Sequence, residues 1–456
     1  MEEHNVRTAN KRRVYALNGL PPEVVAVTFA KCSRSPENFD EISKELDADK
    51  SRKFHEKWVV GYGHGSVAEH AVLSLAIENV SILATKVIED NRLASYTEKS
   101  TRYQQFDKSR YYTPDLSDDL AKVFTETADF ILDKYTSIIP KMTEFVRQKY
   151  PGMPEILLKN KVFDNLRNML PVCVLTNLGM TINARNLEHA IMKLMTHPLK
   201  EMNLIGDSLK QAALAVTPTL IKYTAYNSYI GETEKELEEK TSLILNDVPQ
   251  DGKSVRLVEY DPDAVDKIVA AILYRFSNLA YETIKSKVSA ISEEEKRSLI
   301  KKALEKMGPH DAPIREFEHA YYTFDILVDY GAFRDIQRHR MMTQTNQDFS
   351  PVYGFDIPSE VIESGLEKEY IDCMKAAKQT FRIISERYPK EAQYILPMAF
   401  KKRVLFKASL RELFHFIRLR SKKEGHESYR KIAQEMHKEL ESIQPFLANF
   451  IKLSFD

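Results

Sequence analysis

The stretch Arg338-His339-Arg340-Met341-Met342-Thr343 decides how this chain is interpreted, because a diverged copy of its surroundings lies in the other half of the sequence. It starts 20 positions after Glu318 of a Glu-His pair, and Asp90-Asn91-Arg92 starts 21 positions after Glu69 of another Glu-His pair. Arg340 lies 248 positions after Arg92, and Glu318 lies 249 positions after Glu69. Near-equal spacing of similar residues indicates an internal repeat.

The repeat extends outward from these segments. Leu170-Pro171 matches Leu396-Pro397, and the segment 183–187 matches 409–413, both at an offset of 226. A few loop insertions would explain the change of offset. We therefore predict a tandem duplication. Its parts are a first repeat at residues 1–230, an acidic linker at 231–254 and a second repeat at 255–456.

The composition excludes several classes of protein. With 456 residues, of which 43% are hydrophobic, the chain is long and apolar enough for two globular domains. Lys plus Arg equals Asp plus Glu at 66 each, so no net field attracts nucleic acid or a membrane, and any anion site must be local. Three widely spaced cysteines argue against a disulfide framework and for a reducing compartment. Since there is no signal pattern and no long apolar run, we expect a cytoplasmic protein.

Hydrophobic periodicity predicts the same order of elements in each half, in a helix-rich α+β fold. A short helix opens each half, near residues 22–32 and 263–280. Alternating apolar residues predict a strand at 72–77 and another at 322–328. The arginine-containing segment after each strand is expected to be helical, and a long amphipathic helix is expected in the middle of each half. The linker should be a solvated helix plus a turn.

Two clusters in the second half could bind an anion. The triplet 338–340 places three donors on consecutive residues; Arg is the better fork for phosphate or for an imide edge, and His can donate near neutral pH. Arg411, His415 and Arg418 recur at i, i+4 and i+7, without carboxylate partners at those spacings. The plainer alternative for both clusters is a solvated basic surface.

A third cluster lies in the first half, where two hydroxyls, a carboxylate, a guanidinium and a phenol occur within nine residues. Such a loop could hold a phosphate and a nucleobase, and its plainer alternative is a polar turn. The glycine-rich segment 61–66 matches neither a dinucleotide fingerprint nor a P-loop, and the His and Glu residues near it fit no zinc motif, so no metal site is predicted. The residues of the cluster are Ser95, Glu98, Ser100, Arg102 and Tyr103.

Taken together, these segments resemble the flavin-dependent thymidylate synthase family. Its signature is Arg-His-Arg, two residues, Ser, four residues, Ser, one residue and Arg-Tyr, preceded by a Gly-His…Glu-His segment. The resemblance covers nearly all of both halves outside the linker. It implies a site shared between subunits of a homotetramer, where FAD, dUMP and methylenetetrahydrofolate meet. It also implies that reduced flavin supplies hydride, while arginines hold the phosphate and polarise the uracil without a protein nucleophile.

Each half keeps a different part of this signature. The first half has Asp90-Asn91-Arg92 in place of Arg-His-Arg, and Leu194 where the family has its base-polarising arginine, but it retains the Ser-x-Arg-Tyr segment that ends at Tyr103. The second half retains the triplet and Arg420, but it has Val352 in place of the signature's second arginine. The losses are complementary. We therefore expect one composite site between the repeats to be intact and the other to be degenerate.

The resemblance assigns roles to individual residues. Arg420 is expected to be the catalytic residue, because it matches the arginine that polarises the base. Substrate contacts are expected from Glu98, Ser100, Arg102, Tyr103, Arg167 and Arg338. Cofactor contacts are expected from His64, Arg185, His339, Arg340, Arg411 and His415.

The activity implied is methylation of dUMP to dTMP, with FAD as cofactor and with methylenetetrahydrofolate and NADPH as co-substrates. The expected partners are these small molecules and a second copy of the chain, since two fused pairs rebuild a pseudo-tetramer. Three alternatives stay open. They are a related flavin enzyme that acts on another pyrimidine nucleotide or transfers a hydroxymethyl group, a flavin- or nucleotide-binding protein whose catalytic site has decayed, and an oligomeric interaction scaffold.

Overall fold

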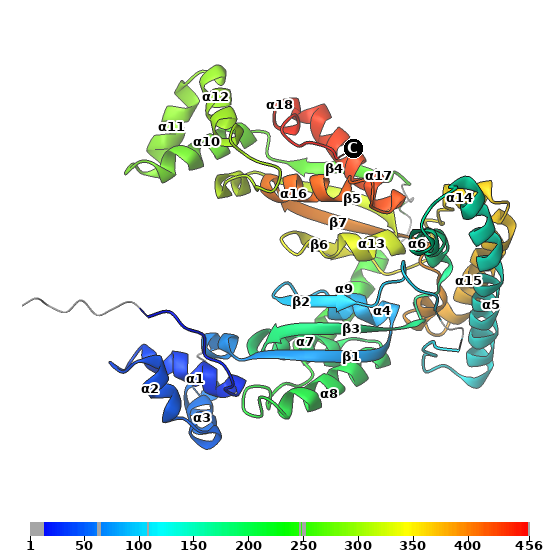
Figure 1. The fold of residues 1–456 in the computed structure, drawn as a ribbon, viewed down its shortest axis with the longest axis horizontal. Helices are drawn as coiled ribbons and strands as arrows, with labels where there is room; N and C mark the ends of the chain where they lie inside the picture. Colours follow the sequence, from blue (N-terminus) through cyan, green and yellow to red (C-terminus); the bar gives the residue numbers. More distant parts are fainter. Residues whose placement is uncertain (1–12, 62–64, 107–108, 246–247, 249–251, 455–456) are drawn as a thin grey trace, which may run out of the picture.

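Two antiparallel sheets, one in each half of the chain, form the frame of the molecule (Figure 1). The computed structural model describes residues 13–61, 65–106, 109–245, 248 and 252–454. The first sheet has the order β1-β3-β2, and the second has the order β4-β5-β7-β6. Since β5-β7-β6 repeats the pattern of β1-β3-β2, the predicted tandem α+β fold is confirmed. The strands are β1 (Val72–Ser81), β2 (Ala94–Glu98), β3 (Leu175–Asn183), β4 (Val255–Tyr260), β5 (Tyr321–Asp329), β6 (Thr343–Asn346) and β7 (Lys401–Ser409).

A capped helix follows two strands of each sheet. α4 (Ile82–Ile88) follows β1 and α13 (Tyr330–Ile336) follows β5, while α7 (Ala184–Thr196) follows β3 and α16 (Leu410–Arg420) follows β7. In each case the side chain of the last strand residue accepts a hydrogen bond from the backbone N–H three residues further on, which stabilises the start of the helix. The capping residues are Ser81, Asp329, Asn183 and Ser409.

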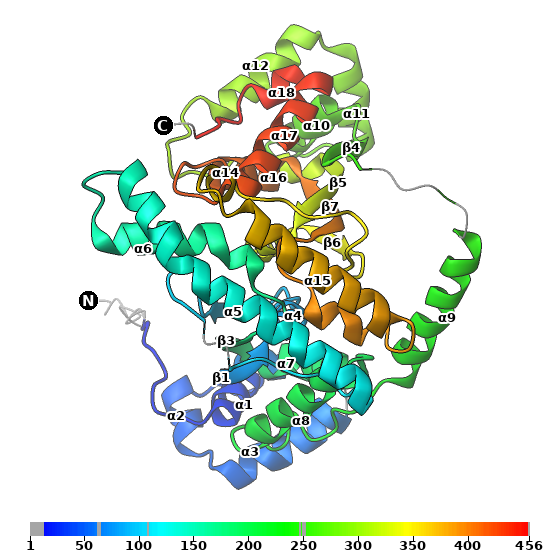
Figure 2. The ribbon, with the colours of Figure 1, turned by 90° about the vertical axis from the view of Figure 1, so that its right-hand side faces the viewer.

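The two long helices α5 (Asp118–Lys149) and α15 (Glu367–Ser385) lie side by side on one side of both sheets (Figure 2). The hydroxyls of Thr127 and Thr380 lie 2.7 Å apart across this contact. Both helices are amphipathic as predicted, with one face turned inward. The buried residues of these faces include Leu120, Phe124, Ile131, Tyr135 and Ile138 on α5, and Tyr370, Met374, Ala377 and Ile384 on α15.

The Leu-Pro segments of the two repeats meet in a short antiparallel bridge. The N–H of Val172 donates to the carbonyl of Leu396 at 3.0 Å, and the N–H of Met398 donates to the carbonyl of Leu170 at 3.0 Å. The two bonds are equivalent, because Met398 and Leu396 lie 226 positions after Val172 and Leu170. This is the offset found in the sequence. The repeats therefore face each other about an approximate twofold axis within one chain.

The change of offset between the repeats comes from helices, which corrects the expectation of loop insertions. α5 has 32 residues, whereas α15 has 19. α6 (Glu155–Leu166) has no counterpart among the described residues between α15 and β7. The first repeat is therefore longer on the side where the two long helices lie.

The arginine triplet is not helical, so that expectation is wrong. α13 ends at Ile336, and the triplet forms a turn. The chain must reverse here because Thr343 at the start of β6 pairs with Lys407 of β7. Strand β4, which extends the second sheet beyond β5, has no counterpart in the first sheet and is not predicted from the sequence.

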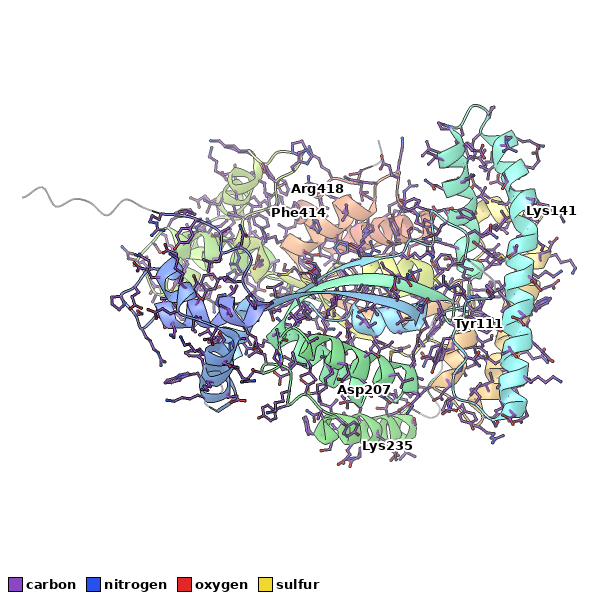
Figure 3. All side chains as sticks on the ribbon, turned by 60° about the horizontal axis from the view of Figure 1, so that its bottom comes forward. Tyr111, Lys141, Asp207, Lys235, Phe414 and Arg418 are labelled. Carbon is purple, nitrogen blue, oxygen red and sulfur yellow. The ribbon has the colours of Figure 1, made fainter. Side chains whose placement is uncertain are left out.

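The solvated helix α9 (Ser228–Ile244) begins three residues before the predicted linker; it has no buried residue and runs outside the repeats (Figure 2; Lys235 marks it in Figure 3). Residues 249–251 of the expected turn lie outside the described residues. In the described part of the chain, no helix is both long and apolar enough to cross a bilayer. The remaining helices are α1 (Pro22–Cys32), α2 (Phe39–Lys44), α3 (Ala48–Phe54), α8 (Lys200–Leu214), α10 (Ala264–Arg275), α11 (Tyr281–Ala290), α12 (Glu293–Leu304), α14 (Ser359–Glu363), α17 (Glu427–Ile443) and α18 (Pro445–Ala448).

Candidate functional site

The loop after β2 of the first repeat and the end of α13 from the second repeat enclose a cavity of about 260 Å³. The six residues predicted to contact the substrate all line this cavity, within one chain. Its lining from the first repeat is Glu98, Lys99, Ser100, Thr101, Arg102, Tyr103 and Arg167, and its lining from the second repeat is Arg334, Asp335 and Arg338.

A second cavity, of about 390 Å³, shares Arg338 with the first. Three residues predicted to contact the cofactor line it, together with the predicted catalytic residue Arg420. Glu412 is the one carboxylate in a lining that carries four arginines, so the cavity favours an anion. The lining consists of Arg92 from the first repeat and Arg338, His339, Arg340, Met341, Glu412, His415, Leu419 and Arg420 from the second.

Glu98 forms buried ion pairs that link the two repeats. Its carboxylate accepts hydrogen bonds from Arg334 Nη2 at 2.6 Å and from Lys86 Nζ at 3.1 Å. Burial alone would raise the pKa of Glu98, but the charges of Arg334 and Lys86 outweigh that effect and hold the pKa at about 2. The side chain is 1% exposed, so a direct contact between Glu98 and a substrate stays a prediction, and its observed contacts are structural.

Two arginines of the first repeat share carboxylate partners. Arg102 forms a two-pronged contact with Asp164, with Nε–Oδ1 at 2.8 Å and Nη2–Oδ2 at 3.0 Å. Arg167 lies 3.6 Å from the same carboxyl group and 3.5 Å from that of Asp335. Burial would raise the pKa of Asp164, but Arg167 and its other cationic neighbours lower it, so the carboxyl group is ionised. A ligand phosphate must compete with these carboxylates for the two guanidinium groups.

Arg420 and His339 meet at the inner end of the larger cavity. Arg420 Nε donates to His339 Nε2 at 3.0 Å, and His339 Nδ1 lies 3.1 Å from a carboxylate oxygen of Glu412. His339 is buried, and burial lowers its pKa. Its closest observed contacts are therefore with protein groups, while Arg340 and His415 form other parts of the lining.

Two predicted cofactor contacts among the described residues, Arg411 and Arg185, do not line this cavity. Arg411 forms an ion pair with Glu318 at 3.0 Å, so the cationic stripe on α16 does have a carboxylate partner, supplied by another element. Arg185 forms the equivalent pair with Glu69 in the first repeat. His64 lies outside the described residues. The roles of these three residues in cofactor binding stay predictions.

The segment of the second repeat that corresponds to the loop after β2 makes contacts within the protein. Phe349 is buried there, with its ring 4.5 Å from that of Tyr330, and its N–H donates to the side-chain oxygen of Gln393, which corresponds to Arg167. Leu194, at the position that corresponds to Arg420, is also buried. Asp90 of the altered triplet forms an ion pair with Lys193. These contacts agree with the expected asymmetry between the two sites.

Sequence analysis does not identify Arg334, Asp335 or Asp164, although all three hold the site together. The local signal is weak. Arg334 and Asp335 directly precede the triplet, and Asp164 lies three residues before Arg167. The fold pairs these charges: Asp164 with arginines of its own repeat, and Arg334 and Asp335 with residues of the other repeat.

Comparisons with known proteins identify what each half of the chain is similar to. The sequence profile of the family described as "thymidylate synthase complementing protein" matches residues 17–219 and again residues 256–446. A UPF0159 protein of Chlamydia pneumoniae is 32% identical over 486 aligned residues, which cover 96% of this chain and 91% of that protein. The flavin-dependent thymidylate synthase of Clostridium tetani is 29% identical and covers 44% of this chain, with 82% of its own length matched. The solved flavin-dependent thymidylate synthase of Helicobacter pylori, in complex with FAD and dUMP, is 20% identical; it covers 44% of this chain with all of its own length, at a TM-score of 0.32.

Two successive profile matches and two sheets of the same topology have one explanation. The chain belongs to the flavin-dependent thymidylate synthase family, as an internally duplicated member whose two copies have diverged.

Proposed function

We propose that the chain methylates dUMP to dTMP at the composite site between its repeats. Methylenetetrahydrofolate supplies the one-carbon group, NADPH supplies the electron pair through FAD, and tetrahydrofolate and NADP⁺ are released. The observation that carries the proposal is the cavity in which all six residues expected to contact the substrate line one space, adjoining the cavity with Arg420. The sequence relatives named as flavin-dependent thymidylate synthases support the same chemistry.

The residues of the larger cavity fit a flavin dinucleotide. Its four arginines and His415 face a single carboxylate, that of Glu412, which is already engaged by His339. This excess of cationic donors suits a diphosphate, and Arg340 is the arginine of the triplet assigned to it. When bound, FAD supplies hydride transfer to the one-carbon unit on the base.

The chain's own residues bind and orient the nucleotide. We assign the phosphate to Arg102, Arg167 and the hydroxyl of Ser100, which lines the cavity between them. Arg338 lies between the two cavities and so reaches the junction where base and cofactor must meet. Arg420 donates to a carbonyl oxygen of the base, where negative charge develops during transfer of the one-carbon group.

We further propose the repeat boundaries 1–230 and 255–456, with the linker between them, and a homodimer as the assembled form. A dimer of fused pairs presents four related domains, and it provides a second copy's surface for the predicted cofactor residues that lie away from the cavity, among them Arg185.

The experiment that tests the function is conversion of dUMP by purified protein loaded with FAD, methylenetetrahydrofolate and NADPH, with the product identified by mass spectrometry. We expect dTMP, and no product from Arg420→Ala. A hydroxymethylated product would instead support the related flavin enzyme. Bound FAD and dUMP without any product would identify a decayed binding protein.

A further inference from the structure

Arg420, the residue proposed to polarise the base, is held by uncharged acceptors. Its Nε donates to Nε2 of His339 at 3.0 Å, and its Nη2 donates to the backbone carbonyl of Asp335. The guanidinium carbon lies 5.2 Å from the centre of the Tyr429 ring. Among the described residues, no carboxylate lies within 4.0 Å of the guanidinium nitrogens. The charge of Arg420 is therefore oriented without being neutralised by a direct ion pair.

His339 can accept this hydrogen bond only as a neutral ring with its proton on Nδ1. Nδ1 lies 3.1 Å from Oε1 of Glu412, which accepts that proton's hydrogen bond. The ring packs against those of His415 and Phe416 on α16, at 5.4 Å and 4.7 Å between ring centres. The carboxylate thus selects the tautomer that presents a lone pair to Arg420, and the aromatic neighbours fix the plane of the ring.

The spacing on α16 explains why an intermediate group is needed. Glu412 and Arg420 are eight residues apart on α16, which corresponds to roughly 12 Å along the helix axis. At this separation the two side chains are too far apart for a direct ion pair. His339 comes from the turn after α13 and spans this gap.

We propose that Glu412 and His339 form a positioning relay for Arg420, an inference that rests on the proposed function of this site. Glu412 fixes the tautomer and orientation of His339, and His339 directs the guanidinium of Arg420 toward the junction of the two cavities. Neither residue of the relay reacts with the substrate. Misplacing a catalytic group by about 1 Å costs about 10²-fold in rate.

The test compares two substitutions of one side chain. Glu412→Met keeps the length of the side chain but removes the oxygen that accepts the hydrogen bond from His339. Glu412→Gln keeps the same length and retains an acceptor oxygen. We expect Glu412→Met to lower kcat for dTMP formation about 10²-fold, with the KM for dUMP and the FAD content near those of wild type. Glu412→Gln should recover most of the lost turnover. A merely structural role would lower the melting temperature and the FAD content together and would not produce this selective recovery.

The matched control is Arg418→Leu. Arg418 lies on the same helix (Figure 3), and it donates to the backbone carbonyls of Pro309 and Asp311, away from both cavities. Its turnover should equal that of wild type. Wild-type kcat in Glu412→Met, or the same loss in Glu412→Gln as in Glu412→Met, would overturn the relay.

Failure of the proposed function gives a different result. If wild type makes no dTMP, calorimetry decides the relay. Glu412→Met should then weaken binding of dUMP while leaving binding of deoxyribose 5-phosphate unchanged, because Arg420 faces the base. Equal affinity of wild type and Glu412→Met for dUMP would overturn the relay in that case too.

Discussion

At the scale of single residues, the site depends on how guanidinium groups are engaged before a ligand arrives. Arg102 holds Asp164 through two parallel hydrogen bonds, a geometry that a lysine cannot reproduce. Arg102→Lys should therefore weaken dUMP binding almost as much as Arg102→Ala, by about 1.5–3 kcal/mol for a charge-assisted contact. Isothermal calorimetry measures this. Equal dUMP binding by wild type and Arg102→Ala would show that the loop is only a polar turn.

FAD binding tests two arginines, Arg340 and Arg411, that the sequence predicts to contact the cofactor. Arg340 lines the larger cavity, whereas Arg411 is paired with Glu318 outside its lining. Arg340→Ala should lose FAD affinity by about 1.5–3 kcal/mol, or roughly 10- to 100-fold, as measured by flavin fluorescence or absorbance of the purified protein. Arg411→Ala shows whether the cofactor also reaches that end of α16. Unchanged FAD affinity in both variants would remove the flavin assignment from this cavity.

The sequence predicts which residues line the small cavity better than it predicts how they are held. The resemblance to the family signature selects six of the residues that line the small cavity. The sequence patterns do not identify Asp164, Asp335 or Arg334, because each is a common residue type at a spacing typical of no motif. Their importance arises only when folding places them against buried charges, which come from the other repeat for Arg334 and Asp335 and from the same repeat for Asp164.

At the scale of elements, β2 and α13 are joined by Glu98, which links strand to helix across the repeats. The pKa of Glu98 is lowered from an ordinary value of 4.5 to about 2, so its charge stabilises the fold fully above about pH 4.5 and progressively less as the pH falls toward 2. Glu98→Gln removes this contribution. We expect it to cost about 3–5 kcal/mol near neutral pH, with the difference from wild type shrinking below about pH 4.5.

Thermal unfolding over a pH series measures that difference. The control is Asp372→Asn, which removes an exposed ion pair with Lys368 on α15 and should change stability little at any pH. A pH-independent difference between Glu98→Gln and wild type would show that the charge of Glu98 does not stabilise the contact between the repeats.

The sequence predicts helices well where a hydrophobic period extends over many residues. It predicts turns and strands poorly where pairing with a distant strand determines the structure. The amphipathic faces of α5 and α15 follow from their spacing alone. The turn at the triplet does not, because it depends on β6 reaching β7, and strand β4 depends on an edge of β5 that only the fold provides. Tertiary pairing overrides local preference in both cases.

At the scale of the whole molecule, the chain folds as two related halves about an internal twofold axis that passes through the Leu-Pro bridge. On one side of this axis two cavities are lined by arginines, whereas Phe349, in the corresponding loop of the second repeat, is buried. Fusion makes this asymmetry possible, because each copy can then diverge separately. A homotetramer of identical chains cannot specialise one site while losing another.

The central claim is that one chain contains both halves of one site, and mixing two impaired variants tests it most directly. Arg102→Ala removes a substrate contact of the first repeat, and Arg420→Ala removes the base-polarising arginine of the second. At dUMP concentrations below the KM, we expect turnover to fall roughly 10- to 100-fold for the lost binding contact and by about 10²–10³ for the catalytic arginine. Arg102 and Arg420 lie in cavities that share Arg338 within one chain. We therefore predict that equimolar mixing of the two variants, followed by subunit exchange, restores no dTMP formation. Recovery of about a quarter of wild-type activity, the value expected when half of the dimers are mixed and each mixed dimer holds one intact site, would contradict the account and place the site between chains.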